Sequence, residues 1–333
     1  MTTREGEIQR KYMGRRDLGS LLPGVKYGHK VYPNEIAGML GLPYVGDIFY
    51  VDPTGGSDGN PGTSQGDALA TVSAAYAKCT SGKHDVVIIA PTGGTGRATE
   101  TSAITWAKRF THLIGSAAPL MQDHRAGISF GAGGSLTVSE NGCIFKDITL
   151  TSSVDTDVTV TVTGDYNAFL GVDFRGTTNA TSIGSTPWRA LVLTGAEENL
   201  FESCSIGADT MLRSAANASL ELKTAATRNV FSNCFFPVYT DDAAAVFVIA
   251  DSAADVDRFA WFKNCTFHNA SFSNSTTMTV GMTIHAAVGG TIILDGCTAL
   301  GITDWASDYT AVVACNNPKV TAQNSGFMEN VTT

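Results

Sequence analysis

A block of seven residues recurs along most of the chain, and this repeat limits the possible fold more than any other feature. Its copies read IFKDITL (144–150), AFLGVDF (168–174), LFESCSI (200–206), VFSNCFF (230–236), WFKNCTF (261–267), IILDGCT (292–298) and a degraded TAQNSGF (321–327). Between them lie second alternating strands at 135–139, 158–163, 190–194, 219–223, 245–250, 282–288 and 311–315. Short strands that repeat about every 30 residues, joined by Gly, Asn and Asp turns, predict a parallel β-solenoid whose coils bury their inner faces by stacking.

Composition agrees with an all-β chain. Charged residues make up only 16% of the 333 residues, whereas an ordinary soluble domain has about 25%. Glycine is abundant, with 35 residues, and the apolar fraction of 43% is sufficient for a core. We therefore expect an all-β solenoid of roughly seven to eight coils rather than a helical bundle or a disordered chain.

Cysteine occupies one position of the block in four successive copies. A position that accepts Ile, Val and Cys is typical of an inward apolar column, in which Cys acts as a small buried hydrophobe. Neighbouring coils lie about 4.8 Å apart, so disulfides along the column would need distorted geometry. The predicted core ladder consists of Ile148, Val172, Cys204, Cys234, Cys265 and Cys297.

The chain divides into three predicted parts. Residues 1–47 show no sustained period and form an extended N-terminal arm, and residues 112–333 form the solenoid body. Residues 48–111 supply a strand, a turn-rich loop, one short capping helix and a first coil. The helix is expected within 68–79, because Val72, Ala75, Tyr76 and Cys79 follow the i, i+3, i+4, i+7 spacing of an amphipathic helix.

The arm differs from the body in charge. Its first 30 residues carry seven Lys or Arg and three acids, for a net charge of +4, whereas the remaining 303 residues carry −13. Its apolar side chains are too numerous for a free linker, so we expect the arm to attach the protein to another surface. The candidate attachment residues are Arg10, Lys11, Arg15, Arg16, Leu21, Leu22, Tyr32, Met39 and Leu40.

Glycan hydrolysis on a solenoid would need two carboxylates from neighbouring coils, about 5 Å or 6.5–9.5 Å apart. The two outward columns of the block read Lys146, Leu170, Glu202, Ser232, Lys263, Asp295 and Thr149, Asp173, Ser205, Phe235, Thr266, Thr298. Neither column has carboxylates on consecutive coils. Asp173 and Glu202 are one coil apart but offset along the strand to roughly 10 Å. We therefore assign no catalytic residue, although this pair remains the one loose alternative.

We predict no metal ion and no cofactor. The six histidines lack metal-ligand spacing, and the acidic loop at 52–62 is explained equally well by turn chemistry. An acidic body does not favour nucleic acid. The longest apolar run, 243–250, is too short to span a membrane, and the N-terminus lacks an apolar signal region. The expectation is a soluble protein made in a reducing cytoplasm.

Three segments carry a family resemblance: YVDPTGGSDGNPGTS at 50–64, ATVSAAYAKC at 70–79 and DVVIIAP at 85–91, followed by the xFxNCxF coils. Together they resemble the right-handed parallel β-helix proteins of the pectate-lyase-like superfamily, and within it the virion β-helix proteins of tailed bacteriophages. The resemblance covers roughly residues 48–330 and implies fold more than function.

This resemblance implies a non-enzymatic virion protein, such as a capsid decoration or cement protein held by its arm. Its partners would be the major capsid protein or other virion proteins and further copies of itself, with a homotrimer implied by the phage β-helix proteins. It would reside in the virion. The alternative is a tailspike or tail-fibre module that binds or cleaves host surface glycans. A secreted polysaccharide lyase is disfavoured, because no signal peptide and no cluster of Asp residues is evident.

Overall fold

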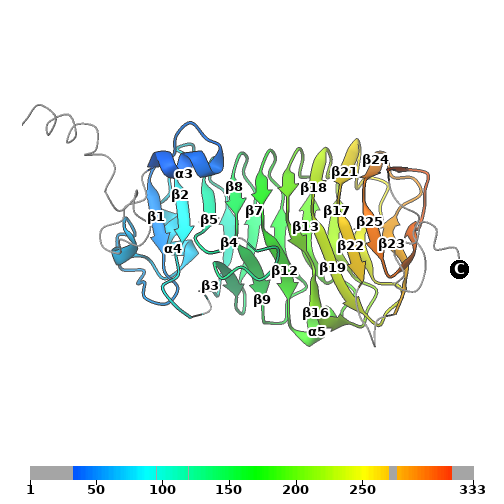
Figure 1. The fold of residues 1–333 in the computed structure, drawn as a ribbon, viewed down its shortest axis with the longest axis horizontal. Coiled ribbons are helices and arrows are strands. Elements are labelled where there is room, and N and C mark those ends of the chain that lie inside the picture. Colours follow the sequence, from blue (N-terminus) through cyan, green and yellow to red (C-terminus); the bar gives the residue numbers. More distant parts are fainter. Residues whose placement is uncertain (1–32, 95, 119, 270–275, 317–333) are drawn as a thin grey trace, which may run out of the picture.

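The computed structural model describes residues 33–94, 96–118, 120–269 and 276–316. Within them the chain forms an elongated rod built of three sheets of parallel strands (Figure 1). Sheet A contains β1 (Ile48–Val51), β2 (Val86–Ile89), β5 (His112–Gly115), β8 (Ile144–Lys146), β11 (Ala168–Leu170), β14 (Leu200–Glu202), β18 (Asn229–Ser232), β21 (Phe259–Lys263), β24 (Thr291–Asp295) and β27 (Val312–Cys315).

Two further sheets complete each coil. Sheet B contains β3 (Arg97–Glu100), β6 (Gly127–Phe130), β9 (Thr149–Ser152), β12 (Asp173–Thr177), β15 (Ser205–Ile206), β19 (Phe235–Thr240), β22 (Thr266–Asn269) and β25 (Thr298–Leu300), with β16 (Ala208–Arg213) beside β19. Sheet C contains β4 (Ala103–Trp106), β7 (Ser135–Val138), β10 (Val158–Val162), β13 (Arg189–Thr194), β17 (Ala218–Lys223), β20 (Val246–Ala250), β23 (Met278–Ile284) and β26 (Ile302–Ala306).

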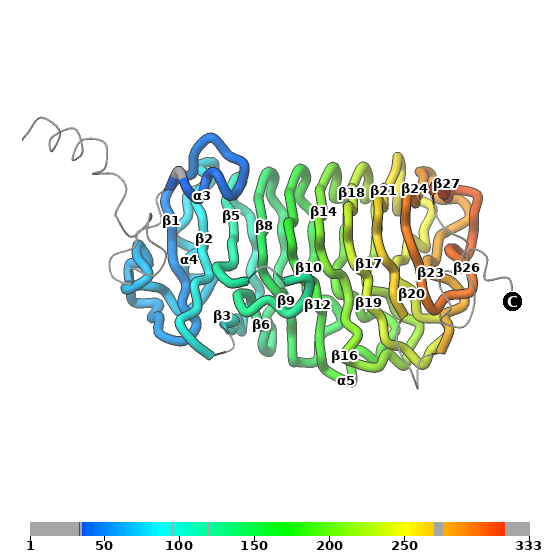
Figure 2. The backbone as a smooth tube through the Cα atoms, viewed as in Figure 1, coloured from blue at the N-terminus to red at the C-terminus, as the bar shows by residue number. Residues whose placement is uncertain are grey.

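The chain passes from sheet A to B to C and returns to A one coil further along the rod (Figure 2). Eight successive coils in the described part, from β2–β3–β4 to β24–β25–β26, have a strand in each sheet. The predicted all-β parallel β-helix is therefore confirmed. Sheet A runs without interruption from β1, so residues 48–111 belong to the same solenoid as the body. No helix in the described ranges is long and apolar enough to cross a membrane.

The repeated block is the strand of sheet A, the corner that follows it and the first residues of sheet B. At the corner one residue per coil has a positive φ, between 51° and 64° in the six coils from β8 to β24. Glycine, and to a lesser degree Asn and Asp, adopts this conformation at low cost. The corner residues are Asp147, Gly171, Ser203, Asn233, Asn264 and Gly296. This requirement explains the Asn, Asp and Gly that punctuate the repeat.

Phenylalanine fills the inward position of sheet A in five successive coils. The rings of Phe145, Phe169, Phe201, Phe231 and Phe262 stack with centroids 5.0, 4.7, 4.6 and 4.7 Å apart, and all five are fully buried. The predicted core ladder lies three residues further along each coil. Ile148, Val172, Cys204, Cys234, Cys265 and Cys297 are all buried, and none of the four cysteines is in a disulfide.

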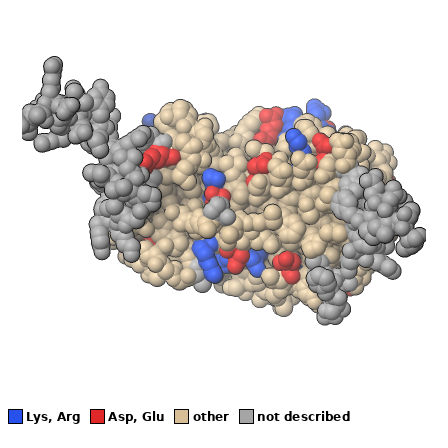
Figure 3. All heavy atoms as spheres, in the orientation of Figure 1, with Lys and Arg blue, Asp and Glu red and all other residues tan. Residues whose placement is uncertain are grey.

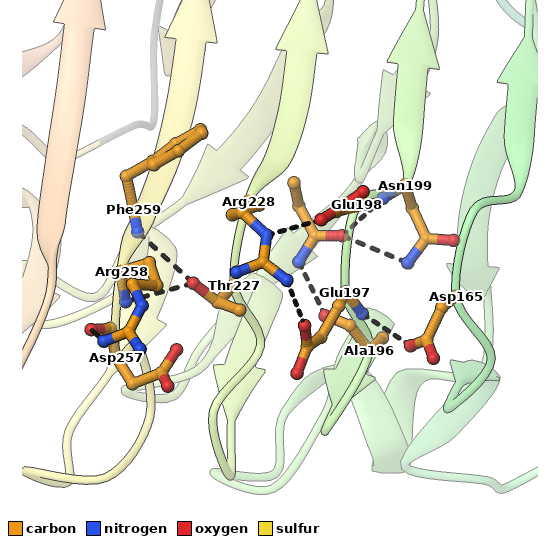
Figure 4. Close-up of polar contacts among 11 residues, drawn as sticks. Asp165, Ala196, Glu197, Glu198, Asn199, Thr227, Arg228, Asp257, Arg258 and Phe259 are labelled. Carbon is orange, nitrogen blue, oxygen red and sulfur yellow. Dashed lines mark hydrogen bonds and ion pairs between the residues drawn. The ribbon is translucent and has the colours of Figure 1, made fainter.

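Buried asparagines join the coils at the corner between sheets C and A. The backbone N–H of Cys143 donates to Asn167 Oδ1 at 2.8 Å, and that of Asn167 donates to Asn199 Oδ1 at 2.8 Å. The N–H of Asn199 donates to Asn229 Oδ1 at 3.0 Å, within the cluster drawn in Figure 4. Each amide thus satisfies a buried donor of the preceding coil, which a turn without side-chain acceptors would leave unpaired.

A short helix closes the N-terminal end of the core. The helix predicted within 68–79 is α4 (Val72–Lys78); its residues Val72, Ala75 and Tyr76 are buried, and so is Cys79 at its C-terminal cap. The Tyr76 ring stacks on Trp106 of the first complete coil, with centroids 4.0 Å apart. The carboxylate of Glu100 accepts the Val72 N–H at 2.6 Å and the Ser73 N–H at 3.1 Å, two donors that the first turn of a helix leaves free. Two other short helical segments are α5 (Ala180–Ile183) and the 3₁₀ helix η1 (Gln65–Asp67).

The end of the predicted arm departs from the sequence expectation. Residues 33–47, expected to lack periodic structure, contain helix α3 (Pro33–Leu40), which lies on the outer face of sheet A. Ile36, Ala37 and Leu40 pack there against Val86 and Ile88 of β2 and Ile114 of β5. The apolar residues of this short segment complete a cluster with the sheet. A helix of eight residues is too short for its hydrophobic periodicity to stand out in the sequence.

A second difference concerns residues 311–315, predicted as an alternating strand between blocks. They contain β27, which pairs with β24 and extends sheet A. The sheet C position of this coil is taken by β26, which the sequence analysis did not identify. The degraded block at 321–327 lies outside the described residues.

The Phe column should dominate the stability of the rod. Phe262→Ala should lower the free energy of unfolding by about 3–5 kcal/mol, because loss of the ring opens a cavity that the neighbouring rings of the stack cannot fill. The adjacent exposed variant Lys263→Ala should change it by less than about 0.5 kcal/mol. Urea unfolding followed by tryptophan fluorescence measures both. Equal effects of the two variants would contradict this packing.

Helix α3 provides a second matched pair. Leu40 is 7% exposed and Met39 is 53% exposed, so Leu40→Ala should destabilise the protein by about 2 kcal/mol and Met39→Ala by less than about 0.5 kcal/mol. The loss should appear as faster hydrogen exchange in β2 and β5, which α3 covers. Unchanged exchange in both variants would show that α3 does not belong to the folded body.

Candidate functional site

The strand pairing fixes which side chains of neighbouring coils are adjacent. The two outward columns pair in the register assumed from sequence, with Leu170 opposite Lys146 and Glu202, and Asp173 opposite Thr149 and Ser205. Among these six paired strands, carboxylates do not occupy adjacent places in one column. Charged side chains nevertheless lie around Asp173, under a loop, and around Glu202, at a nearby cavity.

Asp173 lies in an outward column of sheet B, as expected, but its side chain is not exposed. Its side chain is fully buried, because the segment that links β5 to β6 folds over sheet B at this point. We call residues 116–126, without the undescribed 119, the covering loop. The backbone N–H of Asp123 in this loop donates to Asp173 Oδ2 at 2.8 Å, and Thr149 Oγ1 donates to the same oxygen at 3.3 Å.

Two arginines hold the covering loop against the rod. Arg97 of β3 and Arg175 of β12 both contact the carboxylate of Asp123, and Arg175 Nη1 does so at 3.2 Å from Oδ1. Arg175 Nη2 also donates to Thr210 Oγ1 of β16 at 3.1 Å. The loop therefore bridges three elements of sheet B through one carboxylate and two guanidinium groups, a geometry in which charge-assisted hydrogen bonds are strong.

Several polar atoms under the loop have no partner among the described residues. They include Asp173 Oδ1 and His124 Nε2, and both side chains are fully enclosed. His124 Nδ1 accepts the backbone N–H of Leu120 at 3.4 Å, which leaves the proton of a neutral ring on Nε2. Burial lowers the pKa of His124, so this neutral form is favoured.

Burial raises the pKa of Asp173 to about 6, and the hydrogen bond from Asp123 and the charge of Arg175 only partly oppose this effect. Asp173 can therefore exchange a proton near neutral pH. The covering loop separates it from solvent, so as arranged it cannot contact a substrate. Its chemical role in this conformation is to hold the loop.

A groove with a cavity volume of about 480 Å³ lies beside the covering loop. One wall carries the exposed side chains of Leu120 and Met121, and the other is the corner column of sheets A and B. Lys146 Nζ pairs with Asp147 at 3.1 Å, and Glu202 Oε1 accepts the side-chain N–H of Asn233 at 2.7 Å. With Leu170, the groove thus combines three apolar side chains with three charged groups that already have partners within this chain.

Another charged group lies at the corner of sheets C and A. Arg228 contacts the carboxylates of Glu198 and Glu197, each at 2.6 Å, and the Glu197 N–H donates to Asp165 Oδ1 at 2.9 Å (Figure 4). On the face shown in Figure 3, Lys, Arg, Asp and Glu gather in a few small groups of mixed sign on a surface that is otherwise uncharged.

The sequence-predicted residues are not brought together into one site. Arg10, Lys11, Arg15, Arg16, Leu21, Leu22 and Tyr32 lie outside the described residues. Met39 is exposed on α3, whereas Leu40 is buried under it. The six ladder residues lie in the core, away from any surface. The repeat does not predict the covering loop, for which the only local signal is the adjacent Leu120 and Met121 in a turn-rich segment.

The two carboxylates of the loop at 52–62 accept hydrogen bonds from the loop itself and from neighbouring segments of the chain. Asp52 Oδ1 accepts the N–H of Thr54 at 3.0 Å, and Asp58 Oδ1 accepts the N–H groups of Ala70 and Thr71, each at 2.9 Å. The first is a turn contact, and the second pair fixes the loop to the residues that precede α4. In the described ranges no group of three or more His, Cys, Asp or Glu side chains is placed to hold a metal ion.

No protein-family model matches the chain, and no curated protein matches it. Among solved structures it is similar to pectate lyase Pel9A, with a TM-score of 0.52 and 14% identity over 86% of this chain and 82% of the lyase. Pectin methylesterase PemA from Erwinia chrysanthemi gives a TM-score of 0.47 and 12% identity, covering 84% and 91%. ORF18 of Geobacillus virus E2 gives 0.38 and 14%, covering 88% of this chain and 64% of that one. The likeness to the lyase shows that the two proteins share the parallel β-helix fold.

The buried acid predicts a pH dependence of stability. Because the pKa of Asp173 in the folded protein lies above its ordinary value of 3.8, the folded state binds the proton more tightly. The stability that this group contributes is fully present below about pH 4 and is lost as the pH rises through about 6. The free energy of unfolding of Asp173→Asn, relative to that of the native protein, should therefore rise by on the order of 2–3 kcal/mol between pH 4 and pH 7.

Urea unfolding at several pH values measures this difference, and the exposed Asp209→Asn serves as the control. Parallel pH profiles for the native protein and Asp173→Asn would show that Asp173 is not buried as described.

Proposed function

We propose that this chain is a non-enzymatic structural protein of a tailed-phage particle, a capsid decoration or cement protein attached through its N-terminal segment. Its partners are then the major capsid protein or other virion proteins, together with further copies of itself in a closed oligomer such as a homotrimer. Its location is the virion. It needs no cofactor for this role.

The observation that carries the proposal is that the carboxylates at or near the groove are buried or already paired within the chain. Asp173 is enclosed by the covering loop, Asp147 forms an ion pair with Lys146, and Glu202 accepts a hydrogen bond from Asn233. Each of these carboxylates thus makes its contacts within the rod. A general acid and base would instead need carboxyl groups that face a shared substrate position.

The charge distribution supports attachment through the N-terminal segment. Residues 1–30 carry +4 on a chain whose remainder carries −13. A basic segment speeds encounter with an acidic partner, and its apolar residues would then hold the complex. Since α3 belongs to the folded rod, we restrict the attachment segment to residues 1–32, so that Met39 and Leu40 are no longer part of it.

A tailspike or tail-fibre module that binds host glycans is the second candidate. The groove beside the covering loop favours it, because Leu120 and Met121 offer apolar contact next to hydrogen-bonding groups of Glu202 and Lys146. Sugar sites commonly combine apolar and polar groups in this way. Cleavage, as distinct from binding, would require the covering loop to move away from Asp173.

Removal of residues 1–32 should abolish incorporation into particles of the phage that encodes the chain, while circular dichroism still shows a folded rod. Changing Arg10, Lys11, Arg15 and Arg16 together to Gln should weaken binding more at low salt than at high salt, because exposed charges are screened over about 8–10 Å at physiological ionic strength. Binding of the truncated protein at full occupancy would refute the attachment role of this segment.

The glycan candidate makes a separate prediction. Incubation with host capsular polysaccharide or lipopolysaccharide should release no oligosaccharides if the structural role is correct. Turnover that is lost in Glu202→Ala and retained in Asp295→Ala, a carboxylate of the same column three coils away, would favour the tailspike function instead.

A further inference from the structure

A residue with positive φ turns the chain from sheet C into sheet A in six successive coils, from the coil of β2 to that of β18. Its φ lies between 52° and 71°. In each coil it precedes by two residues a place in sheet A that strand pairing aligns from Val86 to Val230. We call this place the corner position, and it is occupied by His84, Phe110, Gly142, Tyr166, Glu198 and Arg228.

Aromatic residues are a costly choice at the corner position. A bulky residue with positive φ is an outlier, whereas Gly and Asn accept this conformation at low cost. The turn between sheets A and B uses only Asp, Gly, Ser and Asn for the same purpose in the coils from β8 to β24. Phe110 and Tyr166 nevertheless have φ of 52° and 56°, and their side chains are 39% and 58% exposed. Backbone strain that gains so little burial indicates a use for the two rings at the surface.

Glycine occupies the corner position between these two rings. A Cβ atom on Gly142 would lie 2.3 Å from Phe110 Cε1, so the Phe110 ring lies against the glycine backbone. Tyr166 follows one coil further on, and the three residues line a cavity of about 360 Å³. Small-molecule sites measure about 300–1,000 Å³, whereas a protein partner needs about 800 Å² of surface. The cavity therefore has the size of a small-molecule site.

The chain holds the Phe110 ring in place without burying it. The ring stacks on that of His84, with centroids 5.0 Å apart and an angle of 19° between the planes. Tyr44 packs edge-on against His84 at 5.3 Å, and His84 Nδ1 lies 3.1 Å from Nε2 of the buried His112. A ring that is already held loses little conformational entropy when a ligand binds to it.

The polar groups of the cavity supply donors and acceptors without a net charge. Arg109 Nε lies 3.9 Å from Glu140 Oε2, and the two side chains are 62% and 35% exposed. So long and exposed a pair leaves both groups able to bond to a ligand. Asn141, the remaining lining residue, accepts the N–H of Asp165 at 2.9 Å through Oδ1. The cavity thus suits an uncharged ligand that combines apolar faces with hydroxyl groups.

We propose that this cavity, which we call the corner site, binds a neutral hexopyranose unit of a polysaccharide. The C–H groups of a pyranose ring would pack against the electron-rich rings of Phe110 and Tyr166, and its hydroxyls would bond to Arg109 and Glu140. Phe110 and Tyr166 are two coil intervals apart, or about 10 Å at about 4.8 Å each. A sugar chain that runs along the rod can therefore contact both rings.

The charges beside the corner site favour a neutral sugar over an acidic one. The next two corner positions are Glu198 and Arg228, and Arg228 is already paired with Glu198 and with Glu197 (Figure 4). Two carboxylates therefore face one guanidinium group on this side, and a uronic acid would be repelled. The corner site lies between sheets C and A, whereas the groove beside the covering loop lies between sheets A and B. It is also separate from the attachment segment at residues 1–32.

An array of glucan, galactan and mannan oligosaccharides tests the native full chain, with oligogalacturonate as the acidic comparison. We expect at least one neutral oligosaccharide to bind with a dissociation constant of about 1 mM or below. Tyr166→Asn and Phe110→Asn should each weaken this binding by at least about 10-fold, because a ring contact is lost. Saturation-transfer NMR should show the sugar C–H protons against aromatic protons in the native chain.

The variants are chosen so that a loss of folding cannot imitate a loss of binding. Asn adopts positive φ readily, as Asn233 does at the other corner, so Tyr166→Asn should melt no lower than the native protein. Gly142→Asn keeps the backbone conformation but places a side chain against the Phe110 ring, and it should also weaken binding. Met121→Asn, 58% exposed like Tyr166 but in the other groove, should bind as the native protein does.

A native chain that binds none of the neutral oligosaccharides, or that prefers oligogalacturonate, would overturn the proposal. Binding that survives both ring variants would overturn it as well. Binding lost in Met121→Asn instead would assign the sugar to the groove beside the covering loop and reject the corner site. These measurements need no phage particle, so their failure is distinguishable from failure of the attachment role proposed above.

Discussion

Each coil of this rod stacks directly on the next, and this contact between equivalent residues governs the rest of the structure. Parallel strands at about 4.8 Å place a side chain above and below another from the same position of the repeat. A residue is therefore acceptable at an inward position only if it packs against the side chains at the same position in the coils above and below it. Phe satisfies this by stacking, as Phe201 and Phe231 do with centroids 4.6 Å apart, and Cys satisfies it as a small apolar group.

The corners follow from the same constraint. A turn between sheets leaves backbone donors without partners in its own coil, and the next coil must supply acceptors. Asn199 and Asn229 do so at the corner of sheets C and A. At the corner of sheets A and B one residue with positive φ turns the chain, which explains Asn233 and Gly296 at equivalent places. Repetition of one requirement produces the sequence repeat.

The outer surface lacks this constraint, and there the chain departs from its own regularity. Helix α3 covers the start of sheet A, and the covering loop encloses Asp173. Both segments lie on positions that the repeat marks only as outward. The result is a buried carboxyl group with a raised pKa beside a groove, and a sheet A whose outer face is covered by α3 only at its N-terminal end.

The sequence alone determined the parallel β-helix, the register of its coils, the inward columns at Phe201 and Cys204, and the capping helix with Tyr76 buried. These features repeat or are local, and each copy of the block carries the same requirement. Only the tertiary structure decided that Asp173 is enclosed, that Leu40 belongs to the rod and that residues 312–315 return to sheet A. These outcomes depend on single segments that meet the rod through contacts far apart in sequence, and a pattern of one residue type per coil contains no information about what lies on top of it.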